Sequence, residues 1–295
     1  MFKTLKENFQ LDFIGIGVPK AGTTWIYECL KEHPQICCSE PKELHFFNKN
    51  HGFHKPNSAW RYKKGMNWYK KHFSHCKPNQ LKGEIDPLYI YEREALQLIK
   101  KHFPRIKVIV SLRNPIERAY SYYYHLKSKN IFKNLSFEKA IEKEPELKEW
   151  GLYFKYIKNC LEIFSRENVL ILIYEDLQKD PIKFIQKIYE FLKVDVNFVP
   201  KSVRKRINVK TIRMSQISRF TRNIYRFLVK FKIGKSFLKI LRKIGIRQAL
   251  IDYLVLKIKK LPKMNKETRN KLRNFYSEDI KQLELLIKRD LSFWK

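Results

Sequence analysis

The sequence predicts a single α/β domain built on a doubly wound parallel sheet. Short apolar runs rich in β-branched residues are typical of buried parallel strands, and they occur at 12–17, 81–85, 107–112 and 168–174. Helical stretches alternate with these runs, which favours crossover connections. With 295 residues, 44% of them hydrophobic, the chain is long enough to bury one large core.

The helices follow in order along the chain. Apolar spacing and end signals place them at 23–33, 91–103, 114–128, 151–164, 182–194 and 265–294. Pro115 suits the first turn of the third helix. In the last helix, Leu272, Tyr276, Leu283 and Leu286 recur near helical spacing. The expected division is an α/β core at 12–200, a basic helical appendage at 201–262, and a C-terminal helical part at 263–295 that packs back on the core.

The charge of the chain is strongly positive. It has 62 Lys and Arg against 29 Asp and Glu, a net charge of +33, which attracts nucleic acid, anionic lipid, acidic glycans or phosphorylated cofactors. Residues 201–260 hold 19 Lys and Arg and one acid, Asp252, a local net charge of +18. Apolar and basic residues interleave at helical spacing over 213–260. This segment is either a helical pair with a solvated basic back or a docking surface for anionic lipid.

Cysteine and histidine spacing predicts neither a disulfide framework nor a metal site. The five cysteines (Cys29, Cys37, Cys38, Cys76 and Cys160) form no CxxC pair, which favours a reducing cytoplasm. No apolar run approaches the ~18 residues of a membrane span, and no signal peptide is recognisable. We expect a cytoplasmic protein, at the inner membrane surface if the lipid-docking alternative holds. The candidate ligand groups, His51 with His54 and His72 with His75 and Cys76, lack a second matching knuckle, so zinc is the weaker interpretation.

Residues 17–24 form a phosphate-loop pattern with a displaced lysine. Gly17 and Gly22 keep the spacing of a P-loop after a strand, and Thr24 fills its Ser/Thr position. Thr23, however, occupies the lysine position, and Lys20 lies inside the loop. The backbone N–H groups and the following helix N-terminus predict an anion nest. A glycine turn without a ligand is the weaker alternative.

A second anion site is predicted at the end of the third strand of the sequence. Arg113 follows that strand, at the edge where open α/β sheets bind ligands. Ser121 lies roughly two turns into the next helix, so a guanidinium and a hydroxyl can converge on one phosphate. Read alone, Arg113 could be a surface ion-pair residue. Two anion sites on neighbouring strand ends predict a ligand with two separated phosphate groups.

These motifs resemble a known family. "PKAGTTW" and "LRNPIERAYSYYYH" are similar to the two signature regions of sulfotransferases that use 3′-phosphoadenosine 5′-phosphosulfate (PAPS). The resemblance extends through 40–47, 64–73, 172–181 and 285–294, and covers most of the chain outside roughly 213–260. It implies a P-loop-like sulfotransferase fold and PAPS as the sulfate donor. It also implies no metal, because a sulfuryl group carries less charge than a phosphoryl group.

The resemblance also implies residue roles. Lys20 would stabilise the leaving phosphate during in-line transfer to a hydroxyl or amine. The other predicted contacts of the phosphosulfate and the 3′-phosphate are Ala21, Gly22, Thr23, Thr24, Arg113 and Ser121. The element at 42–47 resembles the heparan-modifying branch, whose glutamate is the general base, so Glu43 is the predicted base. His45 is the fallback base or a structural histidine, and a solvated Glu43 is the weaker alternative.

Other features of the resemblance are less direct. Trp25 and Tyr174 either stack on the adenine or belong to the core, and Arg204 and Lys205 either close over the 3′-phosphate or form a solvated basic run. In "GEIDPLY" this chain carries isoleucine and aspartate where the family usually has a lysine and a Ser or Thr before the proline. The C-terminal cystine loop of the heparan-type enzymes is also missing. A heparan-like acceptor is therefore in question, although a carbohydrate or glycolipid remains the implied acceptor class.

Two other functions fit the sequence less well. A P-loop nucleotide kinase would need its usual lysine and a Mg²⁺-holding acid after a strand, but position 23 is threonine and the strand at 107–112 leads into Arg113. A non-enzymatic basic protein that binds polyanions would explain the net charge but not the paired anion sites. No recognised nucleic-acid module is present, so no nucleic-acid partner is expected.

Overall fold

The computed structural model describes residues 9–49, 60–132, 134–204 and 263–295. Several predictions lie outside these ranges. They are the contact by Lys205, the zinc alternative at His51 and His54, and the basic appendage from residue 205 to 262 with its lipid-docking alternative.

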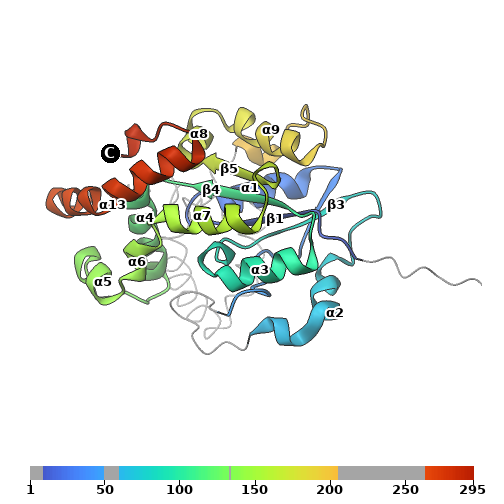
Figure 1. Cartoon of the computed structure of the whole chain (residues 1–295), viewed down its shortest axis with the longest axis horizontal. Helices are drawn as coiled ribbons and strands as arrows, with labels where there is room; N and C mark the ends of the chain where they lie inside the picture. Colours follow the sequence, from blue (N-terminus) through green and yellow to red (C-terminus); the bar gives the residue numbers. More distant parts are fainter. Residues whose placement is uncertain (1–8, 50–59, 133, 205–262) are drawn as a thin grey trace, which may run out of the picture.

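A parallel five-stranded sheet forms the centre of the described structure (Figure 1). The strands are β1 (Phe13–Gly17), β2 (Ile36–Cys38), β3 (Leu81–Ile85), β4 (Lys107–Leu112) and β5 (Val169–Ile173), in the spatial order β2-β3-β1-β4-β5. The strand order reverses direction at β1, so the sheet is doubly wound, as predicted. Ligands of such sheets bind beyond the carboxyl ends of the strands at this switch point, here between β1 and β4.

Helices cover both faces of the sheet (Figure 1). The six predicted helices are present as α1 (Thr23–Glu32), α3 (Arg93–His102), α4 (Pro115–Ser128), α7 (Tyr153–Ile163), α9 (Pro181–Leu192) and α13 (Lys266–Ile287). Shorter helices are α2 (Gly65–Lys70), α5 (Phe137–Lys143), α6 (Glu146–Glu149) and α8 (Tyr174–Lys179). The 3₁₀ turns are η1 (Arg61–Lys64), η2 (Lys71–Phe73), η3 (Tyr89–Tyr91), η4 (Arg166–Asn168), η5 (Lys201–Arg204) and η6 (Ser292–Trp294).

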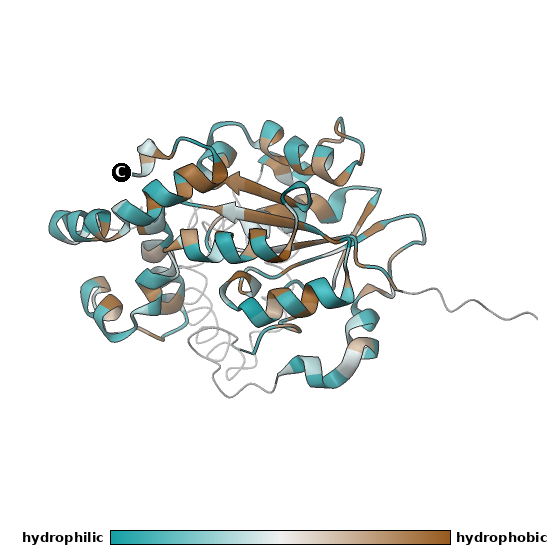
Figure 2. Cartoon of the chain, viewed as in Figure 1, coloured by the Kyte–Doolittle hydropathy of each residue, from teal (hydrophilic) through white to brown (hydrophobic). Residues whose placement is uncertain are grey.

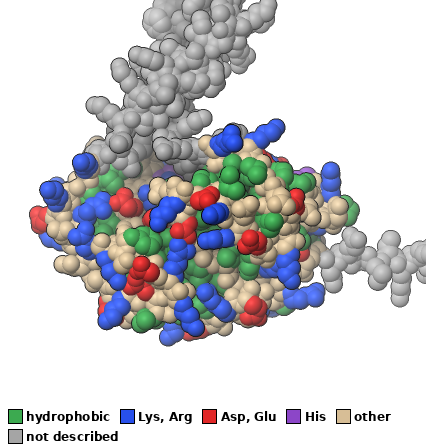
Figure 3. Space-filling view, turned by 90° about the horizontal axis from the view of Figure 1, so that it is seen from above, with side chains coloured by type: hydrophobic (Ala, Val, Ile, Leu, Met, Phe, Trp, Pro, Cys, Tyr) green, Lys and Arg blue, Asp and Glu red, His purple; other side chains and the backbone are tan. Residues whose placement is uncertain are grey.

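The strands are apolar on both faces because each face is buried under helices. Ile14 and Val108 belong to a core shared with α3, α4, α7 and α13. Phe13 and Ile109, the neighbours of these residues along the strands, belong to a second core shared with α1 and α9. Figure 2 shows the resulting brown strands between helices whose outer sides are teal. Figure 3 shows one face on which basic side chains are interspersed with acidic ones.

The C-terminal helix α13 packs against the core on the α4/α7 side. Its residues Leu272, Tyr276 and Leu283 are buried, whereas Leu286 is only partly covered. The Asp279 carboxylate accepts hydrogen bonds from the first N–H groups of α7, at Tyr153 (2.8 Å) and Phe154 (3.1 Å). These contacts fix α13 beside the elements that carry Arg113. In the part of the chain that is described, no helix is long and apolar enough to cross a membrane.

The absence of a disulfide, predicted from cysteine spacing, is wrong for one pair. Cys37 on β2 and Cys76 after η2 form a disulfide across 39 residues of sequence. The two cysteines meet because the segment after η2 runs beside β2, a proximity that sequence spacing does not encode. Cys29, Cys38 and Cys160 are free and buried.

Candidate functional site

The loop between β1 and α1 is shaped by its backbone. The Val18 N–H donates to the Ser111 carbonyl of β4 (2.9 Å), which joins the loop to the neighbouring strand. Gly22 precedes α1 with φ of 82°, in the left-handed region that favours glycine. A Cβ there would lie 2.9 Å from Leu177 Cδ2 and 3.1 Å from Tyr174 Cδ2. The loop therefore needs glycine both for its conformation and for its close approach to α8.

Positive charge converges on Lys20. Burial, followed by the charges of Arg113 and Lys129, lowers the pKa of Lys20 to about 8, and the carboxylate of Glu43 offsets this only in part. Each neighbouring cation disfavours the protonated amine, as expected for a site that gathers cations. Such a site is suited to an anionic ligand, whose charge would reverse the shift.

Arg113 lies against the loop, as its position after β4 predicts. Its Nη1 donates to the Lys20 carbonyl (3.0 Å), and its guanidinium lies 4.8 Å from the centre of the Tyr174 ring. The Tyr153 hydroxyl donates to the Arg113 carbonyl (2.8 Å), which ties this corner to α7. The structure thus brings together Lys20, Arg113 and Tyr174.

Helix α4 presents a histidine that is not among the predicted site residues. Ser121 and His125 are four residues apart on α4 and so share one face of the helix. Burial, then the charges of Lys20 and Lys129, lowers the pKa of His125 to about 3. His125 is therefore a neutral imidazole beside Lys20 at physiological pH. It is the last residue of the second signature, "LRNPIERAYSYYYH", and that position was its only signal.

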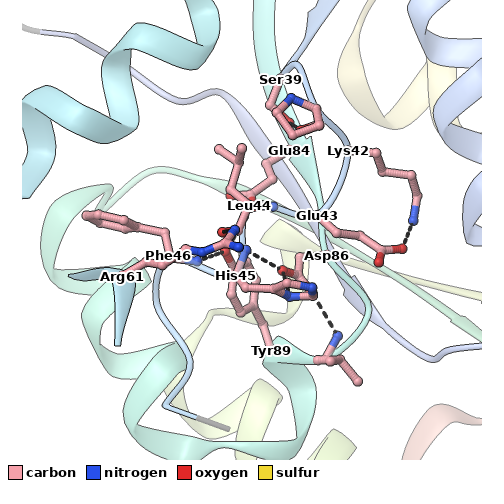
Figure 4. Close-up of polar contacts among 12 residues, drawn as sticks. Ser39, Lys42, Glu43, Leu44, His45, Phe46, Arg61, Glu84, Asp86 and Tyr89 are labelled. Atoms are coloured by element: carbon pink, nitrogen blue, oxygen red, sulfur yellow. Dashed lines mark hydrogen bonds and ion pairs between the residues drawn. The ribbon is translucent and has the colours of Figure 1, made fainter. Parts of the chain in front are cut away.

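The segment after β2 carries the predicted base (Figure 4). Glu43 has φ of 65° and forms an ion pair with Lys42. The negative charge of Glu43 acts against the burial that lowers the pKa of Lys20. Burial raises the pKa of Tyr122 on α4, the charge of Arg118 opposes this, and the charge of Glu43 adds to the increase. Glu43 is therefore electrostatically coupled both to the loop and to α4, the two elements that carry the predicted anion contacts.

His45 is held by a buried carboxylate (Figure 4). Asp86 is fully buried, and its Oδ2 lies 2.7 Å from His45 Nδ1 and accepts the His45 backbone N–H at 2.8 Å. Burial lowers the pKa of His45, but the hydrogen bond and charge of Asp86 outweigh it, so this pKa is raised overall. Burial likewise acts to raise the pKa of Asp86, but the contacts with His45 hold it below its usual value. This geometry agrees with the structural role weighed for His45.

A second buried carboxylate supports the same segment. Glu84 accepts hydrogen bonds from the Leu44 N–H (3.0 Å) and from the hydroxyls of Tyr69 (2.7 Å) and Tyr89 (2.9 Å). Burial and the charge of Asp86 raise the pKa of Glu84 to about 7 despite these bonds. Glu84 and Asp86, two residues apart at the end of β3, therefore fix the backbone between Glu43 and the following phenylalanines.

We expect Asp86→Ala to destabilise the fold by about 3–5 kcal/mol, because it leaves a buried charge and backbone donors without their partner. Glu94→Ala is the control, since it breaks an exposed pair with Lys49 whose contribution should be below about 1 kcal/mol. The loss of stability should be largest at pH values between the lowered pKa of Asp86 and the raised pKa of His45, because both groups are charged there. Urea unfolding at several pH values measures it; equal losses in the two variants would contradict this role.

The structure also places Trp25 and Arg204, two of the other predicted cofactor contacts. Trp25 is 5% exposed and packs edge-on against Phe184 (ring centroids 5.9 Å apart), so its position is that of the core alternative. Arg204 lies on η5, where the Ser202 hydroxyl donates to Glu32 (2.6 Å) at the end of α1 opposite the loop. Thr23 and Thr24 open α1, where the loop ends.

The sequence model of the sulfotransferase domain family matches residues 10–283. The chain belongs to the sulfotransferase family. The match spans the loop, Arg113 and the segment of Glu43, and the sulfotransferase predicted from the signatures is confirmed. The kinase and the non-enzymatic alternatives are not supported.

Relatives and solved structures agree with this assignment. The chain is 30% identical over 188 residues to human heparan sulfate glucosamine 3-O-sulfotransferase 6, covering 60% of this chain and 50% of that protein. It is 28% identical to mouse bifunctional heparan sulfate N-deacetylase/N-sulfotransferase 4, covering 63% of this chain and 22% of that protein. The chain thus spans half or less of these relatives. A crystal structure of a sulfotransferase from Alicyclobacillus acidocaldarius has the same fold (TM-score 0.70, 24% identity, 97% of this chain and 99% of that one).

Proposed function

We propose that this sulfotransferase moves the sulfuryl group of PAPS to a hydroxyl or amine of a carbohydrate or glycolipid acceptor. The observation that carries the proposal is the meeting of Lys20 and Arg113 at the ends of β1 and β4, joined by a 3.0 Å hydrogen bond. Burial first, and then the positive charges of Arg113 and Lys129, lower the pKa of Lys20, so cations are gathered at a partly dehydrated point. A substrate with anionic groups at both ends of a nucleoside suits two cations on neighbouring strand ends.

Each residue of the site has a distinct role in this proposal. Glu43 takes the proton of the acceptor as the acceptor oxygen or nitrogen attacks sulfur. Lys20 stabilises the negative charge that develops on the departing phosphate oxygen as the sulfur–oxygen bond breaks. Arg113 and Ser121 hold the 3′-phosphate, whose charge does not change during the reaction. Because cations line the loop, the reaction needs no metal ion for this charge.

The acceptor class rests on the relatives and on the segment of the base. Two relatives are named for modifying heparan sulfate, which supports a glycan acceptor. Ile85 and Asp86, however, are buried, and Asp86 supports His45 rather than facing an acceptor. The site therefore lacks a cation at these two positions, which favours a glycan less acidic than heparan sulfate or a glycolipid.

Differential thermal melting tests the donor. PAP, the desulfonated product, should stabilise the protein strongly at physiological salt, whereas ATP with Mg²⁺ and duplex DNA should do so weakly. The Arg113→Ala variant should lose most of the stabilisation by PAP. Stabilisation by ATP with Mg²⁺ that exceeds that by PAP would contradict the proposal and favour a nucleotide kinase.

The pKa of Lys20 predicts a pH dependence of PAP binding. Near pH 8 about half of the free protein carries a neutral Lys20, and the phosphates of PAP favour the protonated form. Binding should therefore take up protons near pH 8, and PAP affinity should fall as the pH rises above it. Calorimetry in two buffers of different ionisation enthalpy measures the uptake. It should vanish in Lys20→Ala; an unchanged uptake in that variant would assign it to another group.

A further inference from the structure

Three potential zinc ligands meet at the edge strand β2, which precedes the segment that carries Glu43. They are Cys37 on β2 and the neighbours His75 and Cys76 after η2, and their ligand atoms all lie within 4.8 Å of one another. Two thiolates and an imidazole are a ligand set that zinc prefers, and tetrahedral zinc holds such atoms about 3.3–3.8 Å apart. This is the only such group found among the described residues.

The surroundings of His75 favour metal binding. Its Nε2 lies 3.2 Å from the Cys38 carbonyl, a bond that Nε2–H must donate. This tautomer leaves Nδ1 with a free lone pair, the arrangement in which metal-binding histidines donate their other N–H to a backbone carbonyl. Burial is graded across the group: Cys37 is buried, Cys76 is half-buried and His75 is exposed. An ion and a water ligand can therefore reach the site from the side of His75.

The two chain segments are held together without the disulfide. The Glu40 N–H donates to the His72 carbonyl (3.1 Å), and His72 Nδ1 lies 2.8 Å from the Glu40 carbonyl. Ser39 N–H also donates to the Gly83 carbonyl of β3 (2.9 Å). Cleavage of the Cys37–Cys76 bond thus leaves both thiols in place beside His75.

We propose that Cys37, His75 and Cys76 form a redox-gated zinc site. In the oxidised chain the two sulfurs are bonded to each other and cannot both bind a metal. A thiol or phosphine reductant supplies two electrons, and two protons join the sulfurs as the disulfide bond breaks. Zinc then displaces those two protons and binds two thiolates, His75 and a water molecule. Cys37 lies six residues before Glu43 on the same segment, so this segment links the redox state of the site to the position of the base.

The test measures zinc in the untagged protein. The chain is reduced with a phosphine, loaded with Zn²⁺, separated from excess metal and assayed by mass spectrometry of the metal, with an oxidised sample in parallel. We expect about one zinc per reduced chain and none per oxidised chain. Co²⁺ in place of Zn²⁺ should give a thiolate-to-metal absorption band. A folded, reduced chain that binds no zinc would overturn the proposal and leave a structural disulfide only.

Variants assign the ligands. Cys37→Ser and His75→Ala should each lose most of the bound zinc. If Cys37→Ser does not fold, His75→Ala alone tests the ligand set, because it removes an exposed side chain and still allows the disulfide to form. Cys38→Ser is the matched control, because Cys38 is the adjacent residue and packs into the core on the α1 side of the sheet. Zinc retained by His75→Ala, or lost from Cys38→Ser, would refute this ligand set. PAP-induced stabilisation checks that each variant remains folded.

Discussion

Glu43→Gln should lower the rate of sulfate transfer by about 10²–10⁴-fold while PAP still binds. The amide keeps the size of the side chain but cannot accept the acceptor's proton. The resemblance of 42–47 to the heparan-modifying branch suggests Glu43 rather than His45 as the base. Electrostatics supports this choice, because the charge of Glu43 acts on Lys20 whereas His45 is paired with Asp86. Single-turnover kinetics with labelled PAPS, together with PAP titration, separate the two effects.

The matched control is Glu40→Gln. Glu40 lies three residues before Glu43 on the same segment, and its exposed carboxylate forms an ion pair with Lys31. This variant should leave turnover within about twofold, because an exposed pair contributes little. Near-normal turnover in Glu43→Gln would exclude this residue as the base. His45→Gln and His125→Gln would then be compared, since His45 lies two residues after Glu43 and His125 lies beside Lys20 of the loop.

Lys20→Ala should lower turnover by about 10²–10³-fold, the usual effect of removing one donor to a developing negative charge. Its effect on PAP affinity should be smaller, because the lysine interacts most strongly when the leaving oxygen gains charge. Arg113→Ala should show the opposite balance, with PAP affinity lowered more than turnover, because the 3′-phosphate contact persists throughout the reaction. Equal effects of the two variants on turnover and affinity would contradict these separate roles.

The sequence carried enough information for four strands of the sheet and for the meeting of the loop with Arg113. Four strands are short apolar runs, and the loop at 17–24 and Arg113 follow two of them, so parallel pairing alone predicts that they meet. The strand β2 was missed because Ile36–Cys38 is too short to show a period and lies at the sheet edge. Its pairing with β3 is what brings the following segment to the ends of the strands.

Contacts between distant segments could not be derived from spacing. The pairing of His45 with Asp86 spans 41 residues, and the Cys37–Cys76 disulfide spans 39. Asp86 was noted only as a departure from the family pattern, although its burial makes it the anchor of His45. His125 lay within a recognised signature, but its closeness to Lys20 depends on how α4 faces the loop. The position of Trp25 beside the loop predicts a cofactor contact as readily as a core residue, and only the structure shows that its side chain is packed in the core.

Transfer of labelled sulfate is the most direct measurement of the proposed function. The protein is incubated with sulfur-labelled PAPS, excess EDTA and a panel of glycans and glycolipids, and labelled product and PAP are quantified together. We expect label in at least one carbohydrate acceptor, PAP in equal amount, full activity in EDTA, and loss of both products in Glu43→Gln. Transfer that stops on chelation and returns with Mg²⁺, or PAPS left intact with every acceptor, would contradict metal-independent sulfuryl transfer at this site.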